Sequence, residues 1–158
     1  MSFSIQFLDQ PLLYPFDDPE TPGAAGLLVM GESKEGFCSS LYHWSKRQYE
    51  SQWQRAFDVL LNESPKAALI IEYIRPDAAS QLEWWAMYRE GETVYLQNQL
   101  LFYAQLREPF SLDAPFASLR DRETISADGQ PISEWSVALS EIKEFVRGSR
   151  PARPDLLP

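Results

Sequence analysis

Residues 83–103, EWWAMYREGETVYLQNQLLFY, have the pattern of a β-hairpin. Apolar side chains alternate along residues 82–89 and again along 93–102, and a glycine between two glutamates separates the two runs. This spacing is typical of antiparallel strands joined by a tight turn. One face of the hairpin carries Trp84 and the other carries Trp85, because successive side chains in a strand point to opposite faces. Since neither face is cleanly polar, we expect both to be at least partly covered.

A long amphipathic helix is predicted to begin after Ser45. Ser45 and Gln48 have the spacing of a capping box, and Trp44 and Tyr49 stand at the two positions of a hydrophobic staple. Apolar residues recur with helical spacing from Tyr49 to Leu61, and the sequence NESP then ends the helix. Such a helix needs an apolar surface on which to lie.

We expect the helix to lie on the Trp84 face of the hairpin, which leaves the Trp85 face for a smaller cover or a partner. The aromatic rings of the hairpin allow three interpretations: a core, a stacking platform for single-stranded nucleic acid, or a docking face for another protein. A stacking platform needs a basic groove, whereas residues 83–103 hold three glutamates and one arginine. The core and protein docking are therefore the favoured interpretations.

The remaining pattern predicts an α+β domain in which antiparallel hairpins are packed by the long helix and by a short C-terminal helix capped at Ser140 and ended by Gly148. Further strands are predicted at residues 3–8, 26–32, 36–42 and 67–75, with a turn at 32–35. Residues 122–126 and 131–137 flank a turn at Asp128–Gly129 and form either a second hairpin or a wide connection. Residues 107–122 should form a loop with one short helical turn. We expect one domain over residues 1–158, with an irregular proline-rich arm at 1–25 and a loose tail at 148–158.

The chain is acidic, with a formal net charge of −9 over 158 residues. Negative charge repels nucleic-acid phosphates and steers basic partners toward the protein, although it also serves solubility alone. The N-terminus lacks the pattern of a secretory signal, no stretch has the length of a membrane span, and there is a single cysteine. We therefore expect a cytoplasmic protein with no membrane association.

Residues that could carry catalysis are sparse. His43 is the only histidine and has no nucleophile in a recognisable local context, and Cys38 has no neighbouring base that would activate its thiol. Zinc spacing, a calcium loop and a glycine-rich phosphate loop are all missing from the sequence. We therefore predict no enzyme, no metal and no cofactor. An enzyme built from dispersed carboxylates stays an alternative, because such groups meet in space and not in sequence.

Three segments together resemble a known family. They are LYHWSKRQYESQW (41–53), WWAMYREGETVYLQNQLLF (84–102) and RETISADGQPISEWSV (122–137), in this order and spacing. They are similar to the CdiI immunity proteins of bacterial contact-dependent growth inhibition systems, in particular to the subgroup whose toxin partner is a nuclease. The resemblance covers residues 26–147.

The resemblance implies a cytoplasmic protein without enzymatic activity that binds the C-terminal toxin domain of a CdiA-type protein. It also implies a curved antiparallel sheet with helices, similar in shape to the Whirly-type single-strand binders. An acidic inhibitor could cover the basic nucleic-acid-binding or active-site surface of a nuclease toxin. The alternative function is single-stranded nucleic-acid binding through the aromatic sheet, since fold similarity alone does not fix function.

Candidate toxin-binding residues follow from charge and from the second hairpin tryptophan, since the resemblance transfers no contact residue. We expect an acidic edge beside Trp85, formed at the hairpin and around the later turn. Its members are Glu83, Trp85, Glu90, Glu92, Asp121, Glu123, Asp128 and Glu134. The alternative for each acid is a solvated carboxylate at a strand end, which would contribute little to binding.

Overall fold

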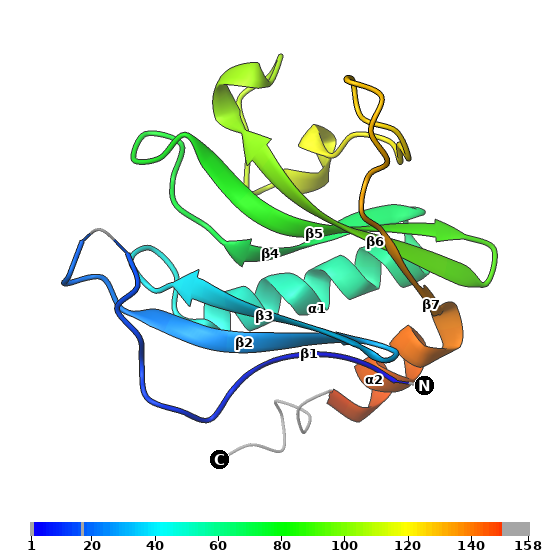
Figure 1. Ribbon diagram of the computed structural model, residues 1–158, viewed down its shortest axis with the longest axis horizontal. Coiled ribbons are helices and arrows are strands. Elements are labelled where there is room, and N and C mark those ends of the chain that lie inside the picture. Colours follow the sequence, from blue (N-terminus) through cyan, green and yellow to red (C-terminus); the bar gives the residue numbers. More distant parts are fainter. Residues whose placement is uncertain (1, 17, 150–158) are drawn as a thin grey trace.

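The computed structural model describes residues 2–16 and 18–149 of the chain, which form two antiparallel sheets and two α-helices (Figure 1). The first sheet has the order β1-β2-β3, with β1 at Phe3–Phe7, β2 at Gly23–Met30 and β3 at Ser33–Ser40. The second has the order β4-β5-β6-β7, with β4 at Lys66–Glu72, β5 at Gln81–Glu90, β6 at Thr93–Phe102 and β7 at Trp135–Ala138. The helices are α1 at Lys46–Asn62 and α2 at Leu139–Ser149, and short 3₁₀ turns occur at Tyr103–Gln105 and Pro115–Ser118. The α+β prediction is confirmed, but the strands form two sheets where the resemblance implied one.

The start of α1 has the predicted capping box. The Ser45 hydroxyl accepts a hydrogen bond from the Gln48 backbone N–H at 3.2 Å, and the Ser45 backbone N–H donates to Gln48 Oε1 at 2.9 Å. The rings of Trp44 and Tyr49 meet edge to face with centroids 5.1 Å apart, as a hydrophobic staple requires. The N-terminus of the helix is therefore fixed by local sequence alone.

Replacing Ser45 by alanine should lower the free energy of unfolding by about 1 kcal/mol, because the Gln48 N–H loses its side-chain acceptor. Urea denaturation would measure the loss. Ser45→Asp is the matched control, since aspartate also caps helices and should keep most of the stability. A loss for Ser45→Asp as large as that for Ser45→Ala would contradict the capping role.

The turn between β5 and β6 agrees with the sequence pattern, whereas the turn in the first sheet does not. Glu90 pairs with Thr93 across a two-residue loop whose first residue, Gly91, has φ +62°. Gly31 has φ +65° in an equivalent loop closed by the pair Met30 and Ser33. Tight hairpin turns of this kind favour glycine at the first loop position, because a positive φ costs it nothing. The predicted turn at 32–35, and with it strands 26–32 and 36–42, was therefore placed two to three residues too late.

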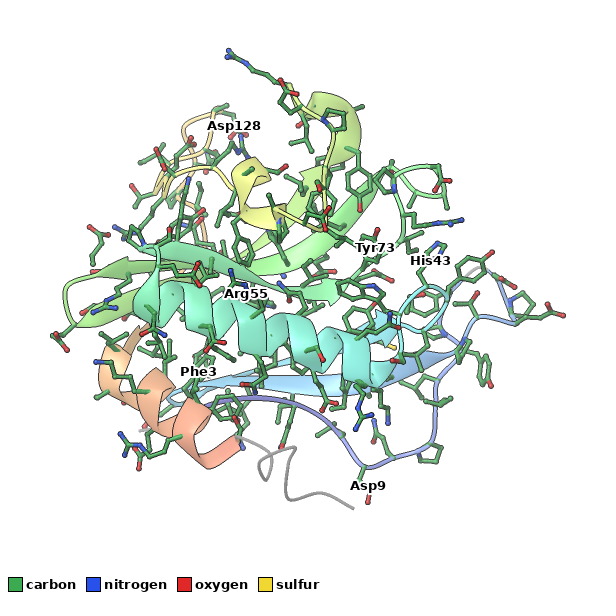
Figure 2. All side chains as sticks on the ribbon, turned by 180° about the vertical axis from the view of Figure 1, so that it is seen from behind. Phe3, Asp9, His43, Arg55, Tyr73 and Asp128 are labelled. Carbon is green, nitrogen blue, oxygen red and sulfur yellow. The ribbon has the colours of Figure 1, made fainter. Side chains whose placement is uncertain are left out.

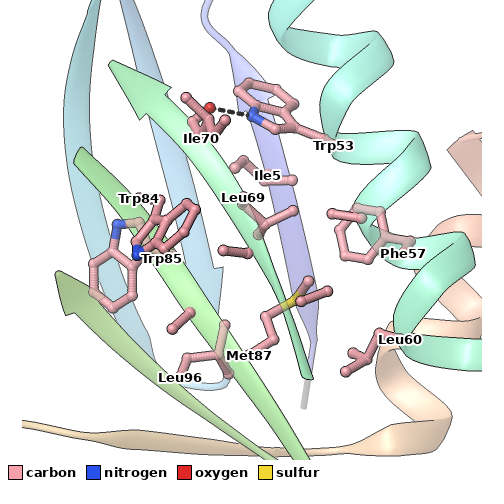
Figure 3. Close-up of a cluster of buried hydrophobic side chains, with 14 of the residues drawn as sticks. Ile5, Trp53, Phe57, Leu60, Leu69, Ile70, Trp84, Trp85, Met87 and Leu96 are labelled. Carbon is pink, nitrogen blue, oxygen red and sulfur yellow. Dashed lines mark hydrogen bonds between the residues drawn. The ribbon is translucent and has the colours of Figure 1, made fainter. Parts of the chain in front are cut away.

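The Trp85 face of the β5–β6 hairpin faces α1, which is the reverse of the prediction. Arg89, on the same face as Trp85, donates from Nη1 to the carbonyl oxygens of Leu60 and Leu61 near the end of α1, at 3.4 and 3.3 Å. Figure 3 shows Leu69 and Met87 directed from the strands toward the α1 side chains. Alternation along the strand fixes two sets of side chains but does not say which set meets the helix.

The Trp84 face is covered by the long connection between β6 and β7. Trp84 packs near Phe116, with ring centroids 6.5 Å apart, and the Tyr88 hydroxyl donates to the Arg120 carbonyl oxygen at 2.9 Å. Gln97 donates from Nε2 to the Glu123 carbonyl oxygen at 2.8 Å. Both faces of the hairpin are therefore covered, as its apolar pattern predicted.

The C-terminal part of the described chain is a wide connection and not a second hairpin. An isolated bridge joins Ile125 to Pro131 around Gly129, which has φ +83° as the predicted turn requires. The strand β7 pairs with β6 instead. The helix α2 begins one residue before Ser140 and continues through Gly148, so neither residue bounds it as predicted. The predicted loose tail lies, from residue 150 onward, outside the described residues.

Candidate functional site

A hollow of about 360 Å³ opens between the two sheets. Glu35 of β3 lies on one side of it, and Glu83 and Trp85 of β5 lie on the other. Toward the far edge of the second sheet it is lined by Asn98 of β6, by Trp135 of β7, and by Ile132 and Ser133 of the connection before β7. Two acidic and two aromatic side chains thus come together from three strands, β3, β5 and β7.

Trp85 lies at the bottom of this hollow and is not a freely exposed side chain. Its side chain is only 4% exposed, and its ring meets that of Trp135 at a centroid distance of 5.3 Å. Glu83 is more accessible, and its Oε2 accepts a hydrogen bond from Asn98 Nδ2 at 2.9 Å. Among the described residues, neither Glu83 nor Glu35 has a salt-bridge partner within 4.0 Å.

A second carboxyl, that of Glu72 in β4, lies next to Glu83. Glu72 pairs with Glu83 across the strands, and burial together with the Glu83 charge raises the pKa of the Glu72 carboxyl above its ordinary value. Burial, followed by the Glu72 charge, likewise raises the pKa of the nearby Cys38 thiol. A negative charge that raises the pKa of a neighbouring acid marks a region where a positive group would be favoured.

A second acidic group surrounds Arg122 on the other face of the sheet. Arg122 donates to Glu90 Oε2 from Nη1 at 2.6 Å and to Glu134 through both Nε and Nη2, at 2.8 and 2.6 Å. Its guanidinium also stacks on the Tyr95 ring, with Cζ 3.7 Å from the centroid. Glu134 accepts a further bond from Gln97 Nε2 at 2.8 Å. These contacts attach the β6–β7 connection to the sheet, so Glu90 and Glu134 have structural partners.

Stability should depend on pH through Glu134, because the hydrogen bonds from Arg122 hold the pKa of its carboxyl below the ordinary value of 4.5. A carboxyl with a lowered pKa in the folded state contributes stability above its unfolded pKa and loses it as pH falls through its folded pKa. The difference in unfolding free energy between the wild type and Glu134→Gln should therefore be constant at neutral pH and shrink below about pH 4.5. Urea denaturation at a series of pH values would measure it, and a difference that does not change down to pH 3 would contradict this role.

The other predicted acids do not join these two groups into one edge. Asp121 forms a salt bridge with Lys66 at 2.9 Å, and Asp128 accepts from the Ser126 hydroxyl within its own turn, which Figure 2 places far from α1. Glu92 and Glu123 are exposed.

The prediction that these acids form a single edge beside Trp85 was therefore wrong. Glu83 and Glu90 are seven positions apart on β5, about 23 Å along a strand, and point to opposite faces. Glu83 lies with Trp85 at the hollow, and Glu90 lies with Glu134 at Arg122. Whether any of these residues contacts a toxin stays a prediction.

Sequence reasoning missed Glu35, Glu72 and Asn98 as neighbours of Glu83. Each comes from a different strand, and no local motif links them. Trp135 carried a usable signal, because it is the tryptophan of the ISEW segment quoted for the family resemblance.

The groups that could carry catalysis do not form a reactive site. The His43 ring packs edge to face against Tyr42 at 4.6 Å, and burial, with a smaller contribution from Arg75, lowers its pKa. The raised pKa of Cys38 keeps its thiol protonated. Within residues 2–16 and 18–149, no three His, Cys, Asp or Glu side chains are grouped as metal ligands would be. No described helix has both the length and the apolar character needed to cross a membrane.

Comparisons with known proteins give a consistent result. Residues 39–145 match the family model described as the CdiI N-terminal domain. The chain is 26% identical over 118 residues to the immunity protein CdiI of Enterobacter cloacae subsp. cloacae, an alignment that covers 75% of this chain and 81% of the relative.

Among solved structures, the fold is similar to a chain of the CdiA-CT/CdiI toxin and immunity complex from Enterobacter cloacae. The TM-score is 0.81 at 23% identity, covering 92% of this chain and 97% of that chain. Because the family model spans well over half of its residues, the chain belongs to the CdiI family of immunity proteins, which confirms the resemblance at the level of the family and the prediction that the protein is not an enzyme.

Proposed function

We propose that the protein is an immunity protein that binds the C-terminal toxin domain of a CdiA-type effector and neutralises it. The observation that carries this proposal is the family match, which runs from the end of β3 through α1 and the second sheet into α2. The similar solved structure is a complex of a CdiA-CT toxin with a CdiI immunity protein. A binding function also agrees with a chain whose histidine and cysteine are not arranged for catalysis.

We further propose that the toxin is a nuclease and that the protein covers its basic nucleic-acid-binding or active-site surface. The net charge of −9 supports this, because acidic and basic surfaces steer each other into contact. Such an inhibitor would act in the cytoplasm, where a nuclease meets its substrate. A curved, Whirly-like shape stays a prediction that comes from the resemblance.

The alternative, a single-strand binder that stacks bases on the hairpin, has less support. Trp84, Trp85 and Tyr88 are 0%, 4% and 4% exposed, so their ring faces are not free to stack on bases. The acidic charge would also repel phosphates. Oligonucleotide binding at low salt, lost steeply as salt is added, would favour this alternative over ours.

The proposal predicts that a CdiA C-terminal domain is encoded beside the gene for this chain, and the test uses that domain. We expect the two purified proteins to form a complex whose association slows as salt rises, and the immunity protein to abolish nuclease activity on RNA or DNA. Co-expression should restore growth of cells that make the toxin domain. If the purified domains do not bind, and nuclease activity and growth arrest persist, the proposal is wrong.

A further inference from the structure

In the described part of the chain, the outer edge of β6 has a partner strand over only four of its ten residues. The strand β6 runs from Thr93 to Phe102, but β7 pairs only with Thr93–Leu96. Within residues 2–16 and 18–149, no backbone hydrogen bond joins the remaining part, residues 97–102, to another segment on that side. Figure 1 shows β7 and the connection before it leading away from this end of β6.

The register identifies which backbone groups face outward. Glu90 and Thr93 close a two-residue turn, so they form a hydrogen-bonded pair, and such pairs recur at every second position along the two strands. Gln97, Gln99 and Leu101 therefore bond to β5. Asn98, Leu100 and Phe102 then direct their N–H and C=O groups toward the open edge.

The opposite edge of the same sheet is covered by side chains. Gln52 of α1 donates from Nε2 to the Ala68 carbonyl oxygen and accepts from the Ile70 N–H, both at 2.8 Å. The Trp53 indole donates from Nε1 to the Ile70 carbonyl oxygen at 2.7 Å, and the Ser39 hydroxyl donates to the Ile71 carbonyl oxygen. No comparable side-chain bonds to the backbone of residues 97–102 occur in the described part of the chain.

The side chains along the open edge are exposed and largely apolar. Leu100 is 45% and Phe102 38% exposed, although both stand in a strand of a sheet whose other apolar residues are mostly buried. Leu100 lies opposite Glu83 in the β5–β6 register, on the same face of the sheet. An exposed apolar strand edge attracts another strand, and soluble proteins usually protect such edges.

The hollow lies directly beside this edge. Asn98 belongs to both, and Glu83, one strand inward, points to the same face as Asn98 and Leu100. A strand placed along the edge would set every second side chain on this face. A lysine or arginine there would approach Glu83 and Glu35, which have no salt-bridge partner among the described residues.

We infer that the Asn98–Phe102 edge of β6 is where the toxin domain docks, by adding an extended segment as a further strand that carries a basic side chain toward the hollow. This inference rests on the proposed function and specifies its surface. Main-chain hydrogen bonds to Asn98, Leu100 and Phe102 would supply affinity, and the contacts of alternate side chains with Leu100, Phe102 and Glu83 would supply specificity.

Amide hydrogen exchange measured by NMR tests the strand pairing directly. In the free chain, the amides of Asn98, Leu100 and Phe102 should exchange quickly, and those of Gln97, Gln99 and Leu101 slowly. In the complex with the CdiA C-terminal domain, the first three should slow at least tenfold and the other three should change little. If the complex forms and the first three amides exchange as fast as in the free chain, the inference is wrong.

Two pairs of matched variants test the surface. Leu100→Lys should weaken toxin binding at least tenfold, whereas Ile125→Lys, at an exposed isoleucine (56%) in the β6–β7 connection, should not. Glu83→Gln should weaken binding more than Glu92→Gln, which removes the same charge at the other end of the hairpin. Thermal unfolding of each variant establishes that it is folded.

The outcomes separate the inference from the proposed function. If the wild type binds the toxin domain, and Leu100→Lys and Glu83→Gln bind it with the same affinity, docking at the β6 edge is wrong but the proposed immunity function still holds. Absence of wild-type binding would overturn the proposed function and the inference together.

Discussion

Replacing Trp53 by alanine should lower the free energy of unfolding by about 4 kcal/mol. The side chain is 3% exposed and lies between α1 and the strands, with ring centroids of Phe7 and Phe37 at 5.0 and 6.0 Å. Its indole also donates from Nε1 to the Ile70 carbonyl oxygen at 2.7 Å (Figure 3). The alanine variant therefore leaves a cavity and removes the donor to a buried β4 carbonyl. Urea denaturation would measure the loss.

Trp53→Phe is the control that separates these two effects. Phenylalanine keeps most of the apolar volume but has no N–H, so the Ile70 carbonyl oxygen loses its indole donor. We expect this variant to lose about 1–2 kcal/mol, clearly less than the alanine variant. Equal losses for the two variants would mean that the hydrogen bond, and not packing, dominates at this position. A loss below about 1 kcal/mol for Trp53→Ala would contradict the central place of Trp53 in the core.

The parts of the fold that could be predicted from sequence are those fixed by local chemistry. Ser45 and Gln48 are three residues apart and bond to each other, so the start of α1 needs no tertiary information. Glu90, Gly91 and Glu92 sit between two strongly alternating runs, so the β5–β6 hairpin was also clear.

Elements without such local signals were misplaced. Gly31 and Gly36 both lie near the expected turn of the first sheet, and only the structure shows that Gly31 takes the positive φ while Gly36 stays within β3. The sequence also did not determine which face of the hairpin meets α1, because Trp84 and Trp85 are chemically alike. The bonds from Arg89 to the α1 carbonyls, which lie on the face that meets the helix, join residues nearly thirty positions apart.

The candidate site was less predictable than the fold for the same reason. Glu83 and Trp85 were selected from the hairpin, but their neighbour Glu35 belongs to the other sheet. Glu134 was selected as a free acid, although Arg122, twelve residues before it, binds it through two nitrogens. A list of acids in a sequence does not separate those with an internal partner from those left for an external one.

Arg122 provides the second large effect, because one guanidinium makes two ion pairs that differ in exposure. The Glu134 side chain is 17% exposed and accepts two hydrogen bonds from Arg122, whereas the Glu90 side chain is 58% exposed and accepts one. Replacing Arg122 by alanine should lower the free energy of unfolding by about 2 kcal/mol, since it removes both pairs and the contact with the Tyr95 ring.

Double-mutant cycles should show that most of this loss of stability comes from the interaction between Arg122 and Glu134. We expect a coupling energy above about 1 kcal/mol between Arg122→Ala and Glu134→Ala, and below about 0.5 kcal/mol between Arg122→Ala and Glu90→Ala. The two pairs share the same arginine, so each is the control for the other. Solvent screening weakens mainly the pair with Glu90, whose side chain is more exposed. Coupling to Glu90 as strong as coupling to Glu134 would contradict this assignment. A strong Glu134 pair would also mean that Glu134 is held by the fold, which leaves Glu83 and Glu35 as the acids beside the open edge of β6 for a basic partner.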